Sequence, residues 1–403
     1  MSLQEATLRV QQMEQHQQLL TDCWSVESPP SYNNSSAVTS LSIPHTIARL
    51  QRHHGGASDK ENTSPEEQER DNTCTASSDA ESCSNDNNNN PDLSNIPEWP
   101  SYLRMLASGE FDRRLEEATN MFTACVACGR FCEVDRLSSD KADWGECRIG
   151  QQAIVSAVDA HFGEEPCLRG VNGSGTIFFG ACNLKCIYCQ NWKLSAMDQG
   201  EVVSDERLAD YMLHLQERGC HNINFVSPTH NILPLLRGVY IAAKRGLRLP
   251  IVFNSGGYDS VASLRLLEGI IDIYMPDAKY SSRAVARKLS KIDNYVEINQ
   301  AAIKEMHRQV GDLQIDPRTG LAYRGLLVRH LVLPNDYGGT HDVADFLFNE
   351  ISQNTYTHVM KYYRPEHEAT DDTKYGLNRR PSNNELAEAL KRARFAGLNR
   401  ILY

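Results

Sequence analysis

The sequence predicts an α/β fold in which a mainly parallel sheet is wrapped by helices. After Val171, short apolar runs alternate with amphipathic stretches, of which Asp205–Arg218 is the clearest helix, preceded by Ser204 as its N-cap. Continuous apolar strands that alternate with helices are typical of a parallel sheet buried on both faces. An open and a closed sheet both fit this pattern. The strand candidates are Thr176–Phe179, Asn222–Val226, Leu249–Phe253, Ile270–Met275 and Leu326–Leu333.

A change in composition near residue 95 separates a polar tail from the globular part. Residues 1–95 hold 14 acidic and 5 basic side chains, which accounts for most of the net charge of −11 of the chain. A segment so rich in Gln, Ser and Asn cannot bury enough apolar surface to offset its ordering entropy. We therefore expect a disordered, low-complexity acidic tail over residues 1–95, with at most a short helix near Leu8–Leu20.

Charge and hydropathy exclude several classes of function. Beyond residue 95 the charges nearly balance, so no basic surface for DNA or RNA is indicated. No apolar run approaches the roughly 20 residues that span a bilayer. The N-terminus lacks the apolar core of a secretory signal, and Glu5 and Glu14 argue against an Arg-rich transit peptide. A cytoplasmic protein is expected, in which the twelve cysteines are more naturally metal ligands than disulfides.

A cysteine-rich lead-in is predicted over residues 96–170. It begins with a helix-like stretch, Pro97–Glu117, and continues into four cysteines within 23 residues: Cys125, Cys128, Cys132 and Cys147. Four thiolates are enough for one closed tetrahedral metal site. The alternatives are a zinc ion, a second iron–sulfur cluster, or four free and partly buried cysteines. Two further cysteines, Cys167 and Cys220, have no partners by spacing and are expected to be small buried apolar residues.

The strongest chemical signal is a loop with three cysteines, Cys182, Cys186 and Cys189, spaced C-x3-C-x2-C, with Tyr188 before the last one. Three thiolates can each hold one iron of a [4Fe–4S] cluster and leave the fourth iron open for a substrate or cofactor. A structural zinc site would need a fourth ligand. A disulfide would need an oxidising compartment.

Several polar motifs follow the other predicted strands. Ser227-Pro-Thr-His230 follows the second candidate, Asn254-Ser-Gly-Gly257 the third, and Asp277 the fourth. Because the carboxyl ends of parallel strands meet at one edge of a sheet, we expect these residues and the cysteine loop to form one site. The acidic turn Glu164-Glu165-Pro166 is expected to be solvated, and the alternative is that its paired carboxylates face a substrate.

Taken together, these motifs resemble the radical S-adenosylmethionine (radical SAM) superfamily, and within it the branch of proteins like pyruvate formate-lyase activating enzymes. The similarity extends from about Cys125 to about Pro365. It implies a partial (β/α)6 TIM-like barrel over residues 171–365, open enough to admit a large substrate, followed by a C-terminal tail over residues 366–403 with one helix-like patch, Asn384–Phe395. The motifs that carry it are the C-x3-C-x-Tyr-C loop, His161–Pro166, Gly173–Phe179, Val226–His230, Asn254–Tyr258, Asp272–Lys279 and Arg329–Pro334.

The resemblance also implies cofactors and chemistry. S-adenosylmethionine would bind the open iron, accept an electron from the cluster and yield a 5′-deoxyadenosyl radical, with an external electron donor as partner. Tyr188 would lie near the adenine or simply pack over the cluster. Many members carry Gly-Gly-Glu after the second strand. Here Ser227 and Thr229 would replace that contact. Asn254 and Asp277 are further cofactor candidates, although Asp277 could instead pair with Lys279 and Gly256-Gly257 could be a tight turn.

Three functions remain open at this stage. The chain could be a radical SAM enzyme, an oxidoreductase or lyase, that activates or modifies a protein, as glycyl-radical activating enzymes do. It could act on a small molecule or nucleotide. It could also be a non-catalytic iron–sulfur or zinc interaction module. The intact open-iron loop and the motifs around it favour an enzyme. They identify neither a catalytic residue nor the substrate.

Overall fold

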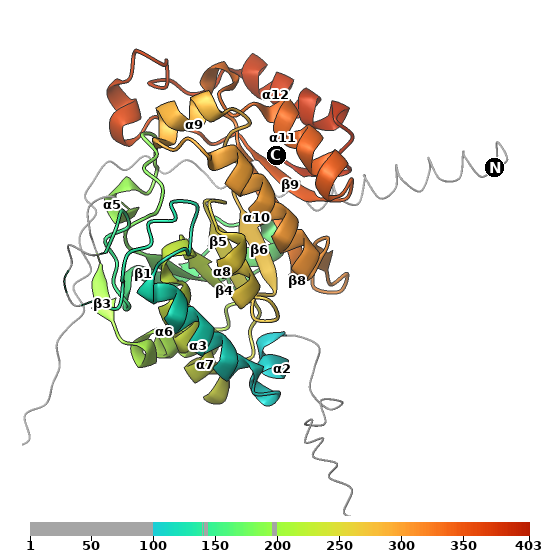
Figure 1. Ribbon diagram of the computed structural model, residues 1–403. Helices are drawn as coiled ribbons and strands as arrows, with labels where there is room; N and C mark the ends of the chain where they lie inside the picture. Colours follow the sequence, from blue (N-terminus) through green and yellow to red (C-terminus); the bar gives the residue numbers. More distant parts are fainter. Residues whose placement is uncertain (1–99, 139, 141–143, 196–199) are drawn as a thin grey trace, which may run out of the picture. The chain divides into compact units, whose positions relative to one another are not determined.

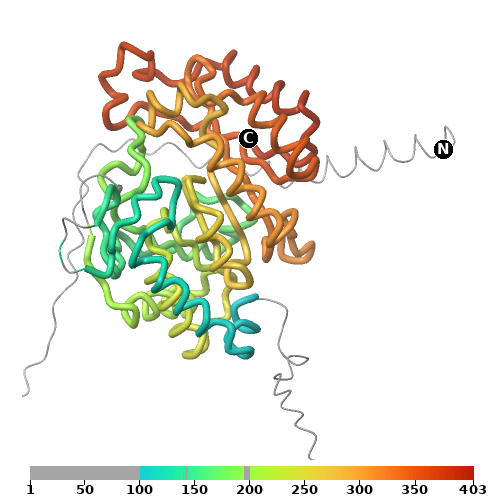
Figure 2. Tube along the Cα trace, viewed as in Figure 1, coloured from blue at the N-terminus to red at the C-terminus, as the bar shows by residue number. Residues whose placement is uncertain are grey.

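The computed structural model describes residues 100–138, 140, 144–195 and 200–403, and all of them belong to one compact unit (Figures 1 and 2). The predicted tail of residues 1–95, with its short helix near Leu8–Leu20, lies outside the described residues. No helix within the described part of the chain is long and apolar enough to cross a membrane.

The sheet confirms the predicted fold class. Its strand order is β10-β9-β8-β6-β5-β4-β2-β1-β3, with β7 (Gln314–Ile315) beside β8. The path ends at β3 (Glu201–Val203) and β10 (Arg400–Leu402), so the described strands form the open, partial (β/α)6 TIM-like barrel. The six central neighbours are all parallel: β2 (Ser174–Phe179), β4 (Ile223–Val226), β5 (Ile251–Ser255), β6 (Ile273–Pro276), β8 (Ala322–Leu331) and β9 (Tyr356–Met360).

The five predicted strands correspond to β2, β4, β5, β6 and β8, with shifted ends. Strand β6 begins three residues later than predicted because Ile270 and Ile271 are buried in the turn before it. Apolar residues in a buried turn lengthen an apolar run without extending the strand. Strand β1 (Ala153–His161), which pairs antiparallel with β2 and β3, was not predicted, and neither were β3, β7, β9 and β10.

Helices cover the outer face of the sheet (Figure 1). The predicted helix Asp205–Arg218 is α6, and Ser204 caps it as expected, since its Oγ accepts a hydrogen bond from Arg207 N at 3.2 Å. The helices after it are α7 (Ile232–Lys244), α8 (Val261–Leu266), α9 (Arg283–Ser290), α10 (Tyr295–Val310) and α11 (Thr340–Phe346).

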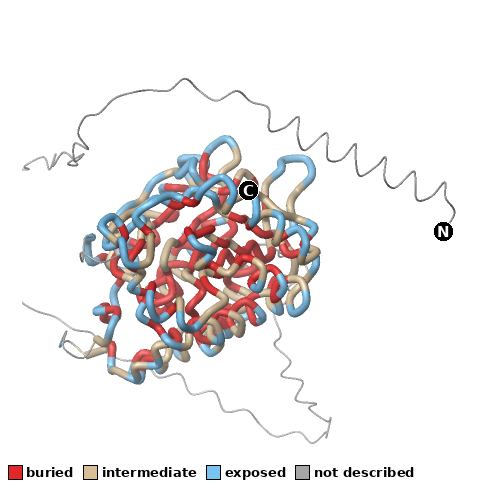
Figure 3. Tube along the Cα trace, turned by 90° about the horizontal axis from the view of Figure 1, so that it is seen from above, coloured by how far each residue is buried: buried red, intermediate tan, exposed pale blue. Residues whose placement is uncertain are grey.

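Alternate residues of the parallel strands belong to two different cores. Ile251 and Phe253 of β5 pack with the helices in the large core, whereas Val252 between them lies in a separate inner cluster. This alternation is the two-residue period of a strand. The inner cluster joins buried side chains of β5, β6 and β8 to the short helix α4 (Pro166–Arg169), so α4 fills the inside of the curved sheet. Buried residues accordingly fill the centre of the molecule (Figure 3).

The helix-like stretch at the start of the fold is two helices, α2 (Tyr102–Ala107) and α3 (Glu110–Thr123). Gly109 breaks the pattern because it adopts φ 75°, which glycine allows without strain. Ser101, just before α2, donates to Asp272 Oδ1 from both its backbone N (2.8 Å) and its Oγ (2.7 Å). These bonds attach the first described residues to the turn before β6.

The C-terminal stretch is part of the fold. The predicted helical patch Asn384–Phe395 is α12 (Asn383–Phe395), whose capping box is formed by Ser382 and Glu385. Helix α12 packs on α11, and β10 adds a parallel strand to β9. Burial of Ala389, Ala393 and Leu398 fixes this segment to the large core.

Candidate functional site

The three-cysteine loop leaves β2 at the carboxyl edge of the parallel strands. It turns at Ala181, which has a positive φ of 61°. Cys182, Cys186 and Cys189 are all partly exposed, and none of the nine described cysteines forms a disulfide. The disulfide alternative is therefore wrong for the described cysteines, and the three thiols are available as ligands.

Neighbouring groups hold two of these sulfur atoms. Cys186 Sγ lies 3.0 Å from Ser290 Oγ at the end of α9, and Leu184 N donates to Cys182 Sγ at 3.4 Å. Ser290 Oγ also lies 2.7 Å from the Tyr280 hydroxyl. Hydrogen bonds of this kind orient thiolates that bind metal.

Tyr188 is a packing residue in this structure. Its hydroxyl lies 2.7 Å from the Tyr280 hydroxyl, and its ring packs edge-on against Tyr280 and Tyr363. Burial raises the pKa of Tyr188 well above its usual value, so the phenol stays neutral. A contact with the adenine of a cofactor remains a prediction.

Polar side chains occupy the inner face of the sheet near the carboxyl ends of its strands. Each lies on the face opposite to neighbours that pack in the large core, as Asn224 does between Ile223 and Phe225. We call this set the inner polar layer. Its members are Asn224, Asn254, Asp277, Arg329 and His358, together with Glu164 and Glu165 from the turn before α4.

Arg329 of β8 connects this layer. Its Nε donates to Asp277 Oδ1 at 3.0 Å and its Nη2 to Asn254 Oδ1 at 2.6 Å. Lys279 Nζ donates to the other oxygen of Asp277 at 2.6 Å, so the predicted Asp277–Lys279 pair is present. The structure thus joins Asn254 and Asp277, two predicted cofactor residues, through an arginine that the sequence analysis had not singled out.

The expectation that Glu164 and Glu165 form a solvated turn is wrong. Their side chains are only 9% and 3% exposed. Glu164 Oε2 lies 3.8 Å from Arg329 Nη1, and Glu165 Oε1 lies 2.8 Å from His358 Nδ1. The cause is α4, because burial of Cys167 and Leu168 in the inner cluster brings the preceding turn inside. Cys167 and Cys220 are buried, as predicted.

The two glutamates differ in their ionisation. Burial raises the pKa of Glu164 to about 7, and the adjacent Glu165 adds to this rise while Arg329 opposes it. Burial also favours the neutral acid at Glu165, but the hydrogen bond with His358 and the charge of Arg329 outweigh it and lower the pKa of Glu165. Two neighbouring carboxyl groups thus have separated titrations, which is common at functional sites.

The motif after β4 is mostly structural. Ser227 adopts φ 57°, and its N–H donates to Asn254 O at 2.9 Å. His230 Nε2 lies 3.0 Å from Gly180 O, and burial lowers the pKa of His230 to about 4, so the ring is neutral. Thr229 is buried at the start of the same turn. Contacts of Ser227 and Thr229 with a cofactor remain predictions.

The glycine pair after β5 forms a tight turn. Gly257 has φ 70°, and a Cβ there would lie 2.2 Å from both Asn299 Nδ2 and Asp277 O. Atoms of the protein itself therefore occupy the space that a side chain at Gly257 would fill. Glycine is needed here for the packing of the turn.

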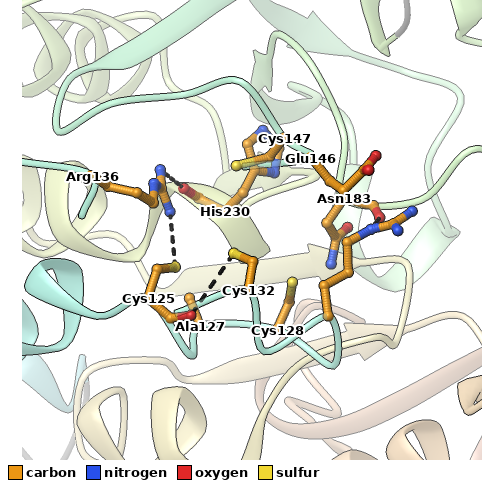
Figure 4. A pocket seen from close by; sticks show the side chains of 10 residues that line it. Cys125, Ala127, Cys128, Cys132, Arg136, Glu146, Cys147, Asn183 and His230 are labelled. Atoms are coloured by element: carbon orange, nitrogen blue, oxygen red, sulfur yellow. Dashed lines mark hydrogen bonds between the residues drawn. The ribbon is translucent and has the colours of Figure 1, made fainter. Parts of the chain in front are cut away.

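The four upstream cysteines come together around one pocket (Figure 4). Within the described residues, no three His, Cys, Asp or Glu side chains are arranged at the spacing of a single metal ion. The cysteines therefore surround a common space without converging on one point. The lining residues are Cys125, Ala127, Cys128, Arg130, Cys132, Arg136, Glu146, Cys147, Asn183 and His230.

Comparisons with known proteins identify the class. A model of the radical SAM superfamily matches residues 176–323. An uncharacterised protein of Methanocaldococcus jannaschii, MJ0674, is 32% identical over 292 residues, which cover 70% of this chain and 78% of that protein. The chain belongs to the radical SAM superfamily, and it is an iron–sulfur protein whose cofactors are a [4Fe–4S] cluster and S-adenosylmethionine.

Two solved structures share parts of the fold at low similarity. The radical SAM methyltransferase TsrM from Kitasatospora setae, solved with cobalamin and a [4Fe–4S] cluster, is 14% identical, with a TM-score of 0.36 over 47% of this chain and 37% of that chain. HydG, a maturase of the [FeFe]-hydrogenase, is 15% identical, with a TM-score of 0.39 over 56% of this chain and 51% of that chain. This chain therefore spans about a third to a half of these proteins.

The residues present fit a [4Fe–4S] cluster at the three-cysteine loop. The loop supplies three thiols outside any disulfide and no fourth cysteine, and Lys279 lies near enough to interact with the charge of Cys186. Asn231, at the start of α7, is fully buried, and neither polar atom of its side chain has a partner among the described residues.

The sequence signal for Arg329 was a charged residue at an inner position of an otherwise apolar strand. No comparable signal marked Asn231.

Proposed function

We propose that this protein reductively cleaves S-adenosylmethionine and that the resulting radical removes a hydrogen atom from a substrate held at the inner polar layer. The carrying observation is the open-iron loop, Cys182–Cys189, at the same sheet edge as this layer, in a chain of the radical SAM superfamily. When bound, the cluster and S-adenosylmethionine supply the one-electron chemistry that yields a 5′-deoxyadenosyl radical. An external donor supplies the electron.

The residues of the chain itself have three tasks in this proposal. The three cysteines hold the cluster, and Ser290 orients Cys186. Buried side chains beside the loop, among them Leu184 and Tyr258, exclude water that would quench a radical. Arg329 and Lys279 fix the Asp277 carboxylate at the inner polar layer.

A side-by-side comparison of two cysteine variants tests the reaction. Cys186→Ala removes a cluster ligand and should lower 5′-deoxyadenosine formation at least about a hundredfold, roughly 2.7 kcal/mol. Cys220→Ala removes a buried thiol far from the site and should change it little. The readout is 5′-deoxyadenosine from anaerobically reconstituted protein with dithionite and S-adenosylmethionine. Equal activity in the two variants contradicts the proposal.

We also propose that the substrate is a protein segment, as in the activating enzymes that the sequence resembles. The described sheet does not close on itself, since its path ends at β3 and β10. Inside it, Glu165 Oε2 and Asn224 Oδ1 are buried acceptors, and the Glu164 carboxyl, which interacts with both side chains, can give a proton to one of them. Peptide N–H groups are neutral donors of the type that the other acceptor lacks.

A deuterium-transfer experiment distinguishes a protein from a small molecule. Extract of the source organism grown in heavy water is separated by dialysis and each fraction is added to the enzyme. Hydrogen abstraction then places deuterium in 5′-deoxyadenosine, which mass spectrometry detects. We expect deuterium only with the macromolecular fraction, and prior protease treatment should abolish it. Deuterium from the dialysable fraction alone would establish a small-molecule substrate instead.

A further inference from the structure

The segment between α3 and β1, residues 124–152, folds without a helix or strand among its described residues. One isolated β-bridge, between Cys128 and Asp259, pairs this segment with the loop after β5. A connection this long without helices or strands usually needs some other interaction to keep it ordered. Even so, Cys125, Cys128 and Cys147 are buried, and they surround the pocket of Figure 4 together with Cys132.

A second observation in the same pocket concerns charge. Arg136 is fully buried, and its guanidinium donates to the carbonyl oxygens of Ile149 (2.7 Å), Gly150 (3.0 Å) and His230 (2.6 Å). Its Cζ also lies 4.1 Å from the centre of the Phe122 ring, and its Nη1 lies 3.7 Å from Cys125 Sγ. No described carboxylate forms an ion pair with Arg136.

A buried guanidinium without an anion is strongly unfavourable, and neutral carbonyls do not cancel its charge. Four thiolates on an oxidised [4Fe–4S] cluster leave about two negative charges in excess. Such a cluster would place the missing negative charge beside Arg136, at Cys125. A metal centre at the cysteines would therefore account for the burial of the positively charged Arg136.

We propose that Cys125, Cys128, Cys132 and Cys147, which surround a common space instead of one point, bind a second iron–sulfur cluster, whose negative charge is balanced by Arg136. The centre lies next to the three-cysteine loop. Asn183, which follows Cys182, lines the same pocket, and its carbonyl oxygen accepts from Arg130 Nε at 2.7 Å. Metal at the upstream cysteines would therefore also fix the loop that carries the first cluster.

The test removes the first site and asks what metal remains. In the full-length chain, Cys182, Cys186 and Cys189 are replaced by alanine, and the reconstituted protein is analysed for metal. We expect about four iron atoms per chain, with the visible absorbance and Mössbauer spectrum of an iron–sulfur cluster. Bound zinc without iron would contradict the cluster. The result does not depend on the proposed reaction, because this variant cannot perform it.

Two derivatives of that triple variant locate the metal. Adding Cys128→Ser and Cys147→Ser should abolish the bound metal, whereas adding Cys220→Ala, a buried cysteine outside the pocket, should leave it unchanged. The proposal is overturned if the triple variant holds no metal while its circular dichroism matches that of the parent, or if both derivatives keep the same metal.

Arg136 is tested in the same background. Arg136→Met should lower the chelator concentration that releases half of the metal by at least about tenfold, since it removes the balancing charge. Arg136→Lys keeps a positive charge and should restore part of the difference. Equal release from the methionine and lysine variants would show that the charge of Arg136 does not stabilise the centre.

Discussion

Glu164 and Glu165 are neighbours in the sequence, but their surroundings favour opposite ionisation states. At Glu165 the hydrogen bond with His358 and the charge of Arg329 favour the carboxylate, whereas at Glu164 burial and the charge of Glu165 outweigh the Arg329 guanidinium, which lies 3.8 Å away. Coupled acids of this kind share one charge at intermediate pH. The pair therefore gives the inner polar layer a proton that can be gained or lost near neutral pH.

The pH dependence of stability should reveal the shifted titration of Glu164. Its folded pKa of about 7 lies above its ordinary value of 4.5, so the folded chain binds this proton more tightly. The stabilisation is complete below about pH 4.5 and is lost as the pH rises to about 7. Glu164→Gln cannot ionise and should therefore be more stable than the parent at pH 8, by on the order of 3 kcal/mol.

The measurement is the difference in melting temperature between Glu164→Gln and the parent at pH 5 and at pH 8. The control is Glu116→Gln on α3, whose carboxyl is more exposed. Parallel melting curves for Glu164→Gln and the parent at both pH values would contradict a raised pKa.

At the scale of single residues, the sequence predicted the candidate metal ligands better than the side chains that interact with one another in the inner polar layer. Cys182, Cys186 and Cys189 stand out by spacing alone. Arg329, His358 and Glu164 meet only because residues far apart in the chain share the inner face of the sheet. No local sequence pattern predicts that these three residues come together. The burial of the glutamates depends on α4, a four-residue helix too short to be recognised by periodicity.

The scale of whole elements shows what holds the three-cysteine loop. Helix α9 ends at Ser290, whose hydroxyl contacts both Cys186 Sγ and the Tyr280 hydroxyl. One helix end thus contacts the loop after β2 and the segment after β6. The strands were largely predictable from their apolar runs, whereas β1, β9 and β10 were missed because they are amphipathic or short.

Ser290→Ala should make the reduction potential of the first cluster more negative. Hydrogen bonds to cluster sulfurs favour the reduced state, and the loss of one worth roughly 1 kcal/mol corresponds to about 40 mV for a one-electron couple. The measurement is a potentiometric titration followed by electron paramagnetic resonance. Ser282→Ala, at the other end of α9 and without a side-chain cap, is the matched control and should leave the potential unchanged. A shift of equal size in both variants would assign the effect to the helix as a whole.

At the scale of the whole molecule, the polar tail should be dispensable for chemistry. A chain that begins at Asn95 keeps Ser101 and all described elements, so its 5′-deoxyadenosine formation should stay within about tenfold of the parent, roughly 1.4 kcal/mol. The full-length Ser101→Ala variant is the informative comparison. It loses one hydrogen bond to the buried Asp272 and should melt at a lower temperature, by an amount equivalent to about 1–3 kcal/mol. Loss of activity beyond tenfold in the shortened chain would show that the tail takes part.

The bonds between Ser101 and Asp272 also have a consequence for the order of folding. The two residues are 171 positions apart, so the first described helix cannot complete its contacts until β6 has left the ribosome. Contacts of such long range slow folding. During synthesis the upstream cysteines emerge well before the strands that bury them, and they stay exposed to oxidants and to competing metals in that interval. A nascent chain therefore carries these four thiols unprotected until the strands that bury them have been made.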